Sequence, residues 1–465
     1  MKDISCTLAI VGSGPGGYVC ALRAGQLGLD VVIVEARKIG GTCLNVGCIP
    51  SKALIHAADE FEKVAEMAAG RGPLGIAVGM PTIDLKKAMA WKDAIVGRLT
   101  GGVATLLKRG KVKVVSGTAR FRDGKTLEVE TETGRQVIRA EAIVIATGSE
   151  PVALPALPFG GRVISSTQAL ALDRAPEKLV VVGAGYIGLE LGMAYAKLGS
   201  AVTLVEAEPR ILPLYDAELT RPVVKRLSAL GMTTLTGARA IGLSGKGDAM
   251  LVEKADRSEL RLEADRILVT VGRRPVLEGW GREELVLDMD GRFLRIDEHC
   301  RTSMRGIYAI GDVTGEPMLA HRAMAQGEMV AEIVAGRRRS WDKRAIPAVC
   351  FTDPEIVTAG LSPEAAARDG REVKVGVFPF SANGRAMTKL GEDGFVRVVA
   401  RADNHLLLGV QAVGRDVSEL AAAFGLALEM GACLEDIAGT IHAHPTLGEA
   451  FQEAALRALG HALHV

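Results

Sequence analysis

The chain has 465 residues, of which 48% are hydrophobic and 24% are charged, and its net charge is +1. This length exceeds what one compact core usually serves, so roughly two to four domains are expected, and the balanced charge gives no general reason to expect nucleic acid or a membrane as partner. Glycines interrupt the uncharged run from Cys6 to Leu22, which therefore fits neither a signal peptide nor a membrane span. The seven cysteines, an odd number without framework spacing, agree with a reducing compartment, and we expect a cytoplasmic protein.

The first predicted unit is a strand, a glycine turn, a helix and a second strand. An apolar run, Thr7 to Val11, leads into GSGPGG at Gly12 to Gly17, a helical pattern follows through Leu27, and a second apolar run, Val31 to Val34, ends at Glu35. The glycines let a pyrophosphate approach the N–H groups at the helix N-terminus, and the glutamate can hold a ribose hydroxyl pair. The motif alone is a weak signal, but here its whole context is present, which predicts a dinucleotide site.

Two cysteines five positions apart follow this unit, in the run GGTCLNVGCIPSK from Gly40 to Lys52. In a regular α-helix Cys43 and Cys48 would be separated by ~7.5 Å along the axis, whereas a disulfide joins Cα atoms roughly 4.4 to 6.8 Å apart. A bond between them therefore requires a bent backbone. Gly47 and Pro50 supply a permissive and a helix-breaking residue for such a bend.

Two other interpretations of this cysteine pair remain open. The thiols could be buried apolar side chains, or they could form half of a metal site. The flanking glycines and lysine favour a redox-active pair over the first. A metal site lacks a second pair, because the other cysteines are scattered singly, at Cys6, Cys20, Cys300, Cys350 and Cys433.

The same strand, glycine turn, helix and strand occur again 171 positions later. Leu179 to Val182 leads into GAGYIG at Gly183 to Gly188, a helix is expected through Leu198, and Val202 to Val205 ends at Glu206. One offset relates both the glycines and the acidic residue, so the sequence predicts two dinucleotide sites. A carboxylate at the end of this strand favours a free 2′-hydroxyl, which predicts NAD rather than NADP at the second site.

Three later segments are predicted to be strands, and two of them would be the last strands of the two dinucleotide-binding units. Apolar runs end in Ala146 to Ser149 and in Val271 to Pro275, where each resembles the closing strand of a dinucleotide-binding unit. The segment Gly306 to Val313 is predicted to end a strand on Asp312, which could accept from a polyhydroxyl group. Taken alone, Asp312 would be a turn residue.

From about Ala345 the sequence changes character and predicts an antiparallel sheet followed by helices. Its polypeptide has no cofactor loop, so an interaction role is expected. The alternating segments are Val373 to Phe380, Gly394 to Val399 and Leu406 to Val413, and the helical stretches are Ser418 to Met430 and Leu447 to Ala458.

The last motif is His444-Pro445-Thr446, with Glu449 three residues further on and His442 two residues before it. Pro445 is expected in the first turn of a helix, so that Glu449 can orient and stabilise an imidazole. A helix start beside an exposed histidine would explain the isolated motif equally well.

Four motifs together are highly specific: GGTCLNVGCIPSK, GAGYIGLELG, AIGDV and HAHPT with its following glutamate. With them the chain resembles, over essentially its full length, the FAD-dependent pyridine nucleotide-disulfide oxidoreductases and, within these, the dihydrolipoyl dehydrogenase family. The resemblance implies an α/β fold with two Rossmann-like dinucleotide-binding domains, for FAD and NAD, and a C-terminal α+β interface domain. The expected divisions are 1–150 for FAD, 151–273 for NAD, 274–345 for a central domain completing the FAD site, and 346–465 for dimerisation.

The resemblance also implies catalytic roles. Cys43 would exchange with the substrate, Cys48 would lie against the flavin, and Lys52 would pair with Glu190 beside the isoalloxazine ring. A histidine and glutamate would reach the other subunit's cysteines, so a monomer should be inactive. The implied catalytic residues are Cys43, Cys48, His444, Glu449, Lys52 and Glu190.

Cofactor contacts follow from the same resemblance. Tyr186 would cover the nicotinamide pocket, and Gly117 would lie near the adenine of FAD. For FAD the expected residues are Gly12, Gly14, Gly17, Glu35, Gly41, Thr42, Lys52, Gly117, Thr147, Gly148, Ser149, Asp312, Met318, Leu319, Ala320 and His321; for NAD they are Gly183, Gly185, Tyr186, Gly188, Glu190, Glu206 and Gly272.

The implied function is oxidation of protein-bound dihydrolipoyllysine with reduction of NAD⁺, in a homodimer that serves a lipoylated acyltransferase of a 2-oxo acid dehydrogenase complex. Three features together resemble bacterial forms serving branched-chain complexes: Gly448, where the family commonly has serine or glutamate, PLG at Pro73 to Gly75, and WKD at Trp91 to Asp93. The chain lacks the C-terminal cysteine pair typical of mercuric reductases, and Glu206 weakens the resemblance to glutathione reductases. A subunit that binds flavin only structurally is the rival from another class, and it would require none of the motif cysteines.

Overall fold

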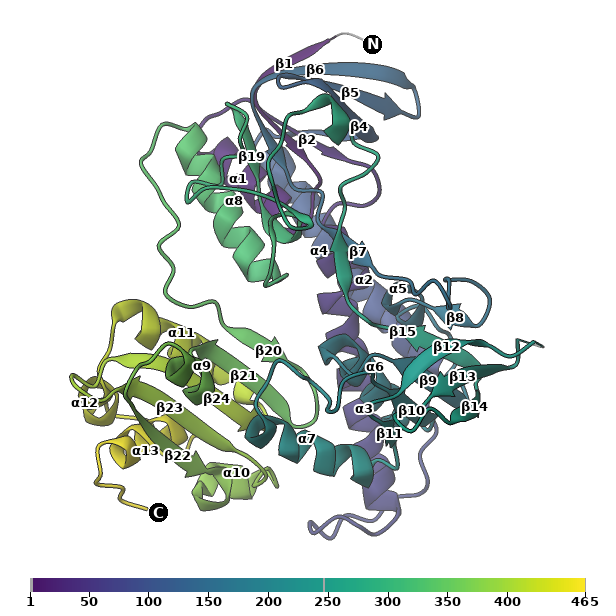
Figure 1. The fold of residues 1–465 in the computed structure, drawn as a ribbon, viewed down its shortest axis with the longest axis vertical. Helices are drawn as coiled ribbons and strands as arrows, with labels where there is room; N and C mark the ends of the chain where they lie inside the picture. Colours follow the sequence, from purple (N-terminus) through teal and green to yellow (C-terminus); the bar gives the residue numbers. More distant parts are fainter. Residues whose placement is uncertain (1–2, 246, 465) are drawn as a thin grey trace.

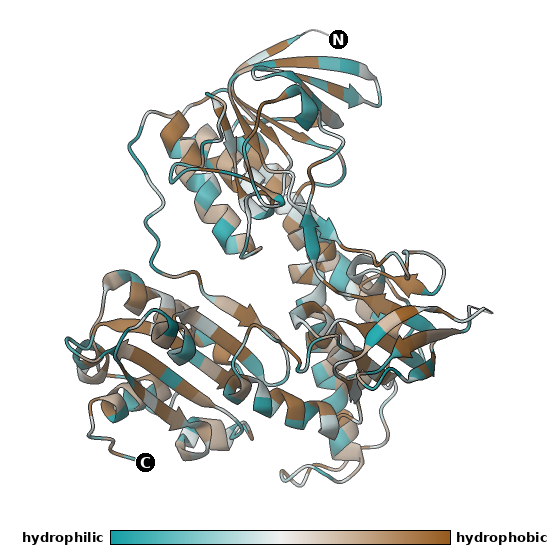
Figure 2. Ribbon diagram, in the orientation of Figure 1, coloured by the Kyte–Doolittle hydropathy of each residue, from teal (hydrophilic) through white to brown (hydrophobic). Residues whose placement is uncertain are grey.

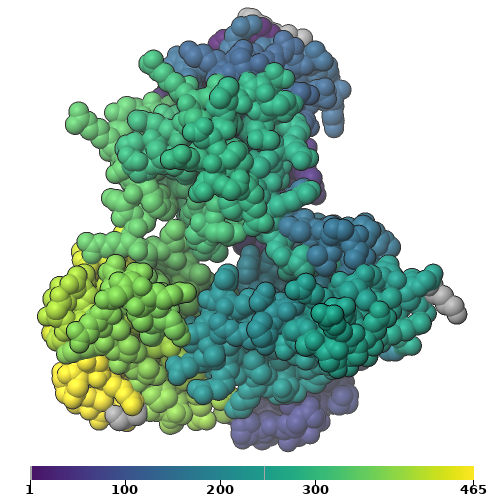
Figure 3. Space-filling view, in the orientation of Figure 1, coloured from purple at the N-terminus to yellow at the C-terminus, as the bar shows by residue number. Residues whose placement is uncertain are grey.

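The computed structural model describes residues 3–245 and 247–464. Figure 1 shows one sheet-bearing unit at the top, near the N-terminus, and two others below it, with the C-terminus at the lower left. The space-filling view shows these parts meeting around a central hollow (Figure 3). Within the described residues, no helix is long and apolar enough to cross a membrane.

The first sheet is built around β1, which pairs in parallel with β2 on one side and with β6 on the other. The strand order is β3-β2-β1-β6-β5-β4, and β19 joins from far along the chain by pairing in parallel with β6. Leu8, Ala9 and Ile10 are fully buried, as expected for a strand covered on both faces. The bounds are β1 Ile4–Val11, β2 Val31–Glu35, β3 Lys113–Ser116, β4 Thr118–Asp123, β5 Thr126–Thr131, β6 Gly134–Ile145 and β19 Ile307–Ala309.

Helices α1 and α8 lie side by side beneath this sheet (Figure 1). Helices α3 and α4 lead away from it toward the lower right unit, so α3 joins two parts of the molecule. The bounds are α1 Pro15–Gln26, α2 Gly41–Val46, α3 Cys48–Ala68, α4 Leu85–Arg109 and α8 Ala320–Val334.

The second parallel sheet has the order β11-β10-β9-β15-β8, and an antiparallel sheet, β12-β13-β14, accompanies it. The two closing strands predicted from the sequence are confirmed: β6 lies beside β1, and β15 lies beside β9. The bounds are β8 Val163–Ile164, α5 Ser166–Ala169, β9 Lys178–Val182, α6 Tyr186–Lys197, β10 Ala201–Val205, α7 Ala217–Ala229, β11 Thr233–Leu235, β12 Arg239–Leu243, β13 Ala249–Glu253, β14 Glu259–Glu263 and β15 Arg266–Val269.

Short elements connect the two parallel sheets. Strand β7 pairs with β16 in antiparallel fashion, so the segments that follow the two closing strands lie together. The bounds are β7 Ser149–Pro151, β16 Arg273–Pro275, η1 Arg282–Glu284, β17 Met289–Asp290, β18 Phe293–Leu294 and η2 Gly311–Thr314.

The last sheet is antiparallel, as predicted, with the order β20-β21-β24-β23-β22. Its strands carry hydrophobic runs (Figure 2), and their buried residues form one core cluster with residues of the helices α11, α12 and α13. The sequence missed α9, α10 and α12, because one or two turns are too short to show a helical period. The bounds are β20 Ala348–Cys350, β21 Glu355–Gly360, α9 Pro363–Arg368, β22 Val373–Pro379, η3 Phe380–Ala382, α10 Gly384–Thr388, β23 Phe395–Arg401, β24 Leu407–Gly414, η4 Val417–Leu420, α11 Ala421–Met430, α12 Leu434–Gly439 and α13 Glu449–Ala458.

Candidate active site

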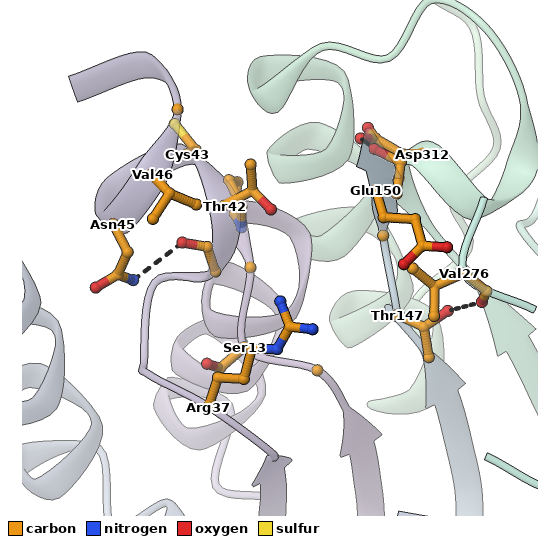
Figure 4. A pocket seen from close by; sticks show the side chains of 18 of the residues that line it. Ser13, Arg37, Thr42, Cys43, Asn45, Val46, Thr147, Glu150, Val276 and Asp312 are labelled. Carbon is orange, nitrogen blue, oxygen red and sulfur yellow. Dashed lines mark hydrogen bonds between the residues drawn. The ribbon is translucent and has the colours of Figure 1, made fainter. Parts of the chain in front are cut away.

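A cavity of about 1000 Å³ lies where the first glycine turn, the cysteine segment and the closing segments meet. In Figure 4, Cys43 lies on the α2 side and Asp312 on the opposite side, while Ser13 and Arg37 come from the first unit. The structure brings these predicted site residues to its walls: Gly12, Gly14, Glu35, Gly41, Thr42, Cys43, Cys48, Lys52, Gly117, Thr147, Gly148, Ser149, Tyr186, Glu190, Asp312, Met318 and Ala320.

The cysteine segment is bent, as the spacing requires. Helix α2 ends at Val46 and α3 begins at Cys48, with Gly47 between them. A Cβ on Gly47 would lie 2.9 Å from the carbonyl oxygen of Thr42, so a side chain there would force the turn open. Pro50 lies in the first turn of α3, where it lacks the N–H that would bond to the carbonyl of Val46 and continue α2, so its predicted helix-breaking role agrees with the break at Gly47.

Cys43 and Cys48 are free thiols here and form a hydrogen bond with each other. That bond and the charge of Lys52 lower the pKa of Cys48 below that of an ordinary thiol, against the burial that would raise it. The same bond, together with burial, raises the pKa of Cys43. The pair is therefore asymmetric, with the anionic form favoured on Cys48. Within the described residues, no group of three or more histidine, cysteine, aspartate or glutamate side chains could hold a metal ion.

The buried carboxylate of Glu190 pairs with Lys52, the lysine that acts on Cys48. The Nζ atom of Lys52 lies 2.8 Å from Oε2 of Glu190, whose side chain is 4% exposed. The other oxygen, Oε1, accepts from the backbone N–H of Phe351 at 3.0 Å, and the ammonium of Lys52 lies 4.4 Å from the centre of the Phe351 ring. No pattern in the sequence indicates Phe351, because this residue reaches the site only through the tertiary packing of the last sheet.

The two predicted ribose glutamates occupy equivalent places. Glu35 accepts from the N–H groups of Ser13 and Arg37, both at 2.8 Å. Glu206 accepts in the same way from Ala184 at 2.6 Å and Glu208 at 2.9 Å. Each carboxylate therefore ties the end of its strand to its own glycine turn.

Both glycine turns fit a dinucleotide. A Cβ on Gly17 would lie 1.9 Å from the carbonyl oxygen of Gly12, and a Cβ on Gly188 would lie 2.1 Å from that of Gly183, so helix and strand approach closely only with glycine at these positions. Gly14 and Gly185 cap α1 and α6, and no described atom lies within 4 Å of a Cβ added to either. Open space therefore faces N–H groups that no described side chain caps, which suits a pyrophosphate.

The second glycine turn, Gly183 to Gly188, contributes only Tyr186 and Ile187 to the cavity lining, and none of its glycines, whereas helix α6 lines the cavity. Tyr186 and Glu190, in the first two turns of α6, reach the cavity wall, and so one helix connects the second turn with the cysteine site. The predicted residues of this turn that lie outside the cavity lining are Gly183, Gly185, Gly188, Glu206 and Gly272.

The sequence predicted that Asp312 ends a strand, and this prediction is wrong. Strand β19 stops at Ala309, and Asp312 lies in the 3₁₀ turn η2, because Gly311 adopts a left-handed conformation, φ 74°, that turns the chain away from the sheet. Its carboxylate accepts from the hydroxyl of Ser149, which accepts in turn from Arg273 Nε at 2.8 Å. Arg273 was missed as a site residue, although it follows the second closing strand directly.

Only part of the stretch from Met318 to His321 lines the cavity. Met318 and Ala320 line the cavity, whereas Leu319 is the N-cap residue of α8 and His321 hydrogen-bonds through Nε2 to the carbonyl oxygen of Pro347 at 2.7 Å. Met318 and Ala320 thus lie on the cavity wall, and Leu319 and His321 lie next to it in sequence but outside its lining. Gly17, likewise, packs under the turn rather than on the cavity wall.

His444 and Glu449 form the predicted pair, with Nδ1 of the histidine 2.8 Å from Oε1 of the glutamate. The imidazole is 79% exposed and does not line the cavity that the described residues form. Partial burial would raise the pKa of Glu449, but hydrogen bonds from the Thr446 N–H and from His444 hold it below its usual range. The prediction that Pro445 lies in a helical first turn is wrong, because α13 begins only at Glu449, which caps the preceding turn through Thr446.

Two family models cover most of the chain: pyridine nucleotide-disulphide oxidoreductase over residues 6–327, and the dimerisation domain of the same family over residues 346–455. The chain is 61% identical to dihydrolipoyl dehydrogenase of Pseudomonas aeruginosa, covering 99% of both proteins. It is 46% identical to the dihydrolipoyl dehydrogenase of Halobacterium salinarum, covering 98% of this chain and 97% of that protein.

Solved structures show the same architecture. LpdA from Mycobacterium tuberculosis superposes with a TM-score of 0.89 at 26% identity, over 97% of this chain and 99% of that one. The HOCl-induced flavoprotein disulfide reductase RclA from Escherichia coli superposes with a TM-score of 0.85 at 25% identity, over 97% and 99%. Together with the sequence relatives, these matches show that the chain belongs to the dihydrolipoyl dehydrogenase family of the pyridine nucleotide-disulphide oxidoreductases.

Proposed function

We propose that this protein oxidises dihydrolipoyl groups to lipoyl groups and reduces NAD⁺, using FAD and a disulfide that forms between Cys43 and Cys48. The observation that carries the proposal is the pair of contacting thiols, bent around Gly47, in which the hydrogen bond from Cys43 and the charge of Lys52 lower the pKa of Cys48. The relatives named dihydrolipoyl dehydrogenase, which match over nearly the full length, supply the substrate class.

In the oxidised protein, a substrate thiolate attacks Sγ of Cys43. A bond forms between the substrate sulfur and Cys43, the bond between Cys43 and Cys48 breaks, and Cys48 leaves as a thiolate. The second substrate sulfur then attacks the first, which closes the lipoyl ring and releases Cys43. Two electrons have thus passed from the substrate dithiol to the two protein sulfurs.

The chain's own charges favour this direction of cleavage. Lys52, one helical turn after Cys48, stabilises the thiolate that leaves, and the N-terminus of α3 adds a partial positive charge at the same place. Tyr186 lies on the cavity wall at the start of α6, where it can cover a nicotinamide. The residues that line the first cavity would hold FAD, which would supply a two-electron acceptor for the reduced sulfurs and a hydride donor for NAD⁺.

His444 is proposed as the base that removes the substrate proton, with Glu449 orienting it. The contact to Glu449 occupies Nδ1, so Nε2 is free to accept a proton, and the imidazole is exposed on its own subunit. It can serve the cysteines of a second copy, which supports a homodimer built through the segment that matches the dimerisation family.

For the cofactors we propose the residues that the sequence indicated, with FAD in the cavity and NAD at the second glycine turn. The proposed divisions remain 1–150, 151–273, 274–345 and 346–465; pairing of β19 with β6 supports a central segment that completes the first site. We further propose a cytoplasmic enzyme whose partner is the lipoylated acyltransferase of a 2-oxo acid dehydrogenase complex, and Gly448 favours a branched-chain complex.

The test is steady-state oxidation of dihydrolipoamide by the FAD-loaded protein with NAD⁺ and, separately, NADP⁺. We expect turnover with a strong preference for NAD⁺, and much slower reduction of glutathione disulfide or Hg²⁺. A yellow protein that turns over none of these would contradict the proposal and favour a flavin-binding subunit without redox function.

A further inference from the structure

Helices α3 and α6 pack side by side and share two charge pairs (Figure 1). Lys52 of α3 pairs with Glu190 of α6 at 2.8 Å. About two turns further along both helices, Asp59 of α3 pairs with Lys197 of α6 at 2.6 Å. The two residues of each pair are 138 positions apart in the sequence, so α3 and α6 run in the same direction and advance together. The charges are reversed in the second pair, where the lysine lies on α6.

A third part of the molecule meets both pairs. The turn between β20 and β21 donates its Phe351 N–H to Glu190 at 3.0 Å and places a carboxylate oxygen of Asp353 2.6 Å from Nζ of Lys197. Arg226 of α7 extends the second contact, because it donates to Asp353 at 2.7 Å and to Glu62 of α3 at 2.5 Å. We call the second group of charges the junction cluster: Asp59, Glu62, Lys197, Arg226 and Asp353.

Lys197 is the buried centre of the junction cluster, with a side chain 4% exposed. Burial alone would lower the pKa of its ammonium, but the carboxylates of Asp353 and Asp59 raise it above the ordinary value. A buried charge of this kind is stable only where its partners are held close. The junction cluster therefore favours one alignment of α3, α6 and the β20–β21 turn.

We propose that the junction cluster is a positioning device for the site two turns away: by fixing α6 and the β20–β21 turn against α3, it keeps Glu190 on Lys52. Lys52 and Cys48 lie one turn apart on the same helix, so their own spacing does not depend on this alignment. What depends on it is how far Glu190 neutralises Lys52. The inference rests on the proposed roles of the cysteines and the flavin.

The charged and titratable groups around the Cys48 sulfur set the expected sign. They are Cys43, Tyr18, Lys52, Glu190 and Tyr186. Lys52 lowers the pKa of Cys48 and Glu190 raises it. If the junction cluster is broken and Glu190 moves off Lys52, the lysine charge acts more fully and the pKa of Cys48 falls. Loss of the distant positive charge of Lys197, acting directly through space, would instead raise that pKa.

The experiment titrates the long-wavelength absorption between the Cys48 thiolate and flavin in the two-electron-reduced holoenzyme. For Lys197→Met we expect the midpoint to fall by about half a pH unit or more, in the same direction as for Glu190→Gln. Arg226→Gln, at a half-buried position, is the second variant in case Lys197→Met does not fold, and the same sign is expected. Lys225→Gln is the matched control. It removes one positive charge from α7 directly before Arg226, but Lys225 pairs with the exposed Asp393 and lies outside the junction cluster.

A midpoint that rises, or that stays equal to the Lys225→Gln control, would overturn the positioning role. Absence of the absorption from the unaltered holoenzyme would instead overturn the proposed roles of Cys48 and the flavin, and this inference with them.

Discussion

Glu449 holds the imidazole of His444 through Nδ1 at 2.8 Å, while a second contact from its other carboxylate oxygen to the Thr446 N–H fixes the carboxylate itself. The glutamate is therefore anchored twice, and the imidazole presents its remaining nitrogen to solvent or to a second subunit. This arrangement suits a base that acts on a substrate carried by another protein.

Replacing His444 by Gln should slow dihydrolipoamide oxidation by about 10² to 10⁴, because the substrate thiol loses its base. Reduction of a dye by NADH should persist, since it needs no substrate thiol. His442→Gln is the control two residues away, where Nδ1 of the ring hydrogen-bonds to the carbonyl oxygen of Thr440 and not to Glu449. Equal loss of both activities in His444→Gln would show that this histidine has another role.

The equivalent glutamates predict two separable defects. Glu206→Gln should raise the KM for NAD⁺ and leave the flavin content unchanged, because the amide has one acceptor oxygen and cannot hold both the Ala184 and the Glu208 N–H groups of the second site. Glu35→Gln should lower flavin retention instead, through the tie to Ser13. Flavin absorbance per chain and the KM for NAD⁺ measure the two effects, and a Glu206→Gln protein that lost flavin would contradict the assignment of the two sites.

The lowered pKa of Cys48 predicts a pH dependence of the reduced enzyme. Its thiolate should persist below the ordinary thiol pKa of about 8.5 and be lost only as the pH falls through the lowered value. Lys52→Met should move the midpoint upward, because the nearest positive charge is gone. The long-wavelength absorption of the reduced holoenzyme reports this, and an unaltered protein with a midpoint at or above the ordinary value would contradict it.

Arg397 predicts an effect on stability rather than on chemistry. Its side chain is 4% exposed and pairs with Asp216, equally buried, so Arg397→Met leaves a buried carboxylate without its partner. We expect a loss of about 3 to 5 kcal/mol in the free energy of unfolding, measured by denaturant titration. Arg401→Met removes an arginine from the same strand, where the partner Asp403 is exposed, and should leave the midpoint unchanged. Similar midpoints for both variants would show that the buried pair adds no stability.

Much of the architecture could be predicted from local patterns. The two glycine turns, the closing strands and the antiparallel sheet each have a period or a turn composition that reports on neighbouring residues alone. Asp312 and Pro445 were misplaced because a glycine with φ 74° and a late helix start are decided by the surrounding packing. Arg273 and Phe351 were missed for a related reason: each reaches the site by pairing with a distant segment, and no spacing in the sequence records that contact.

Cys48, and not Cys43, is proposed as the thiolate beside the flavin. The most direct measurement is the visible spectrum of the FAD-loaded Cys43→Ser and Cys48→Ser proteins at neutral pH. Cys43→Ser should show the long-wavelength thiolate absorption without any reductant, because its Cys48 is permanently free, and Cys48→Ser should lack it even after two-electron reduction. Absorption that survives in Cys48→Ser, or that is absent from Cys43→Ser at every pH, would show that Cys48 is not the thiolate beside the flavin.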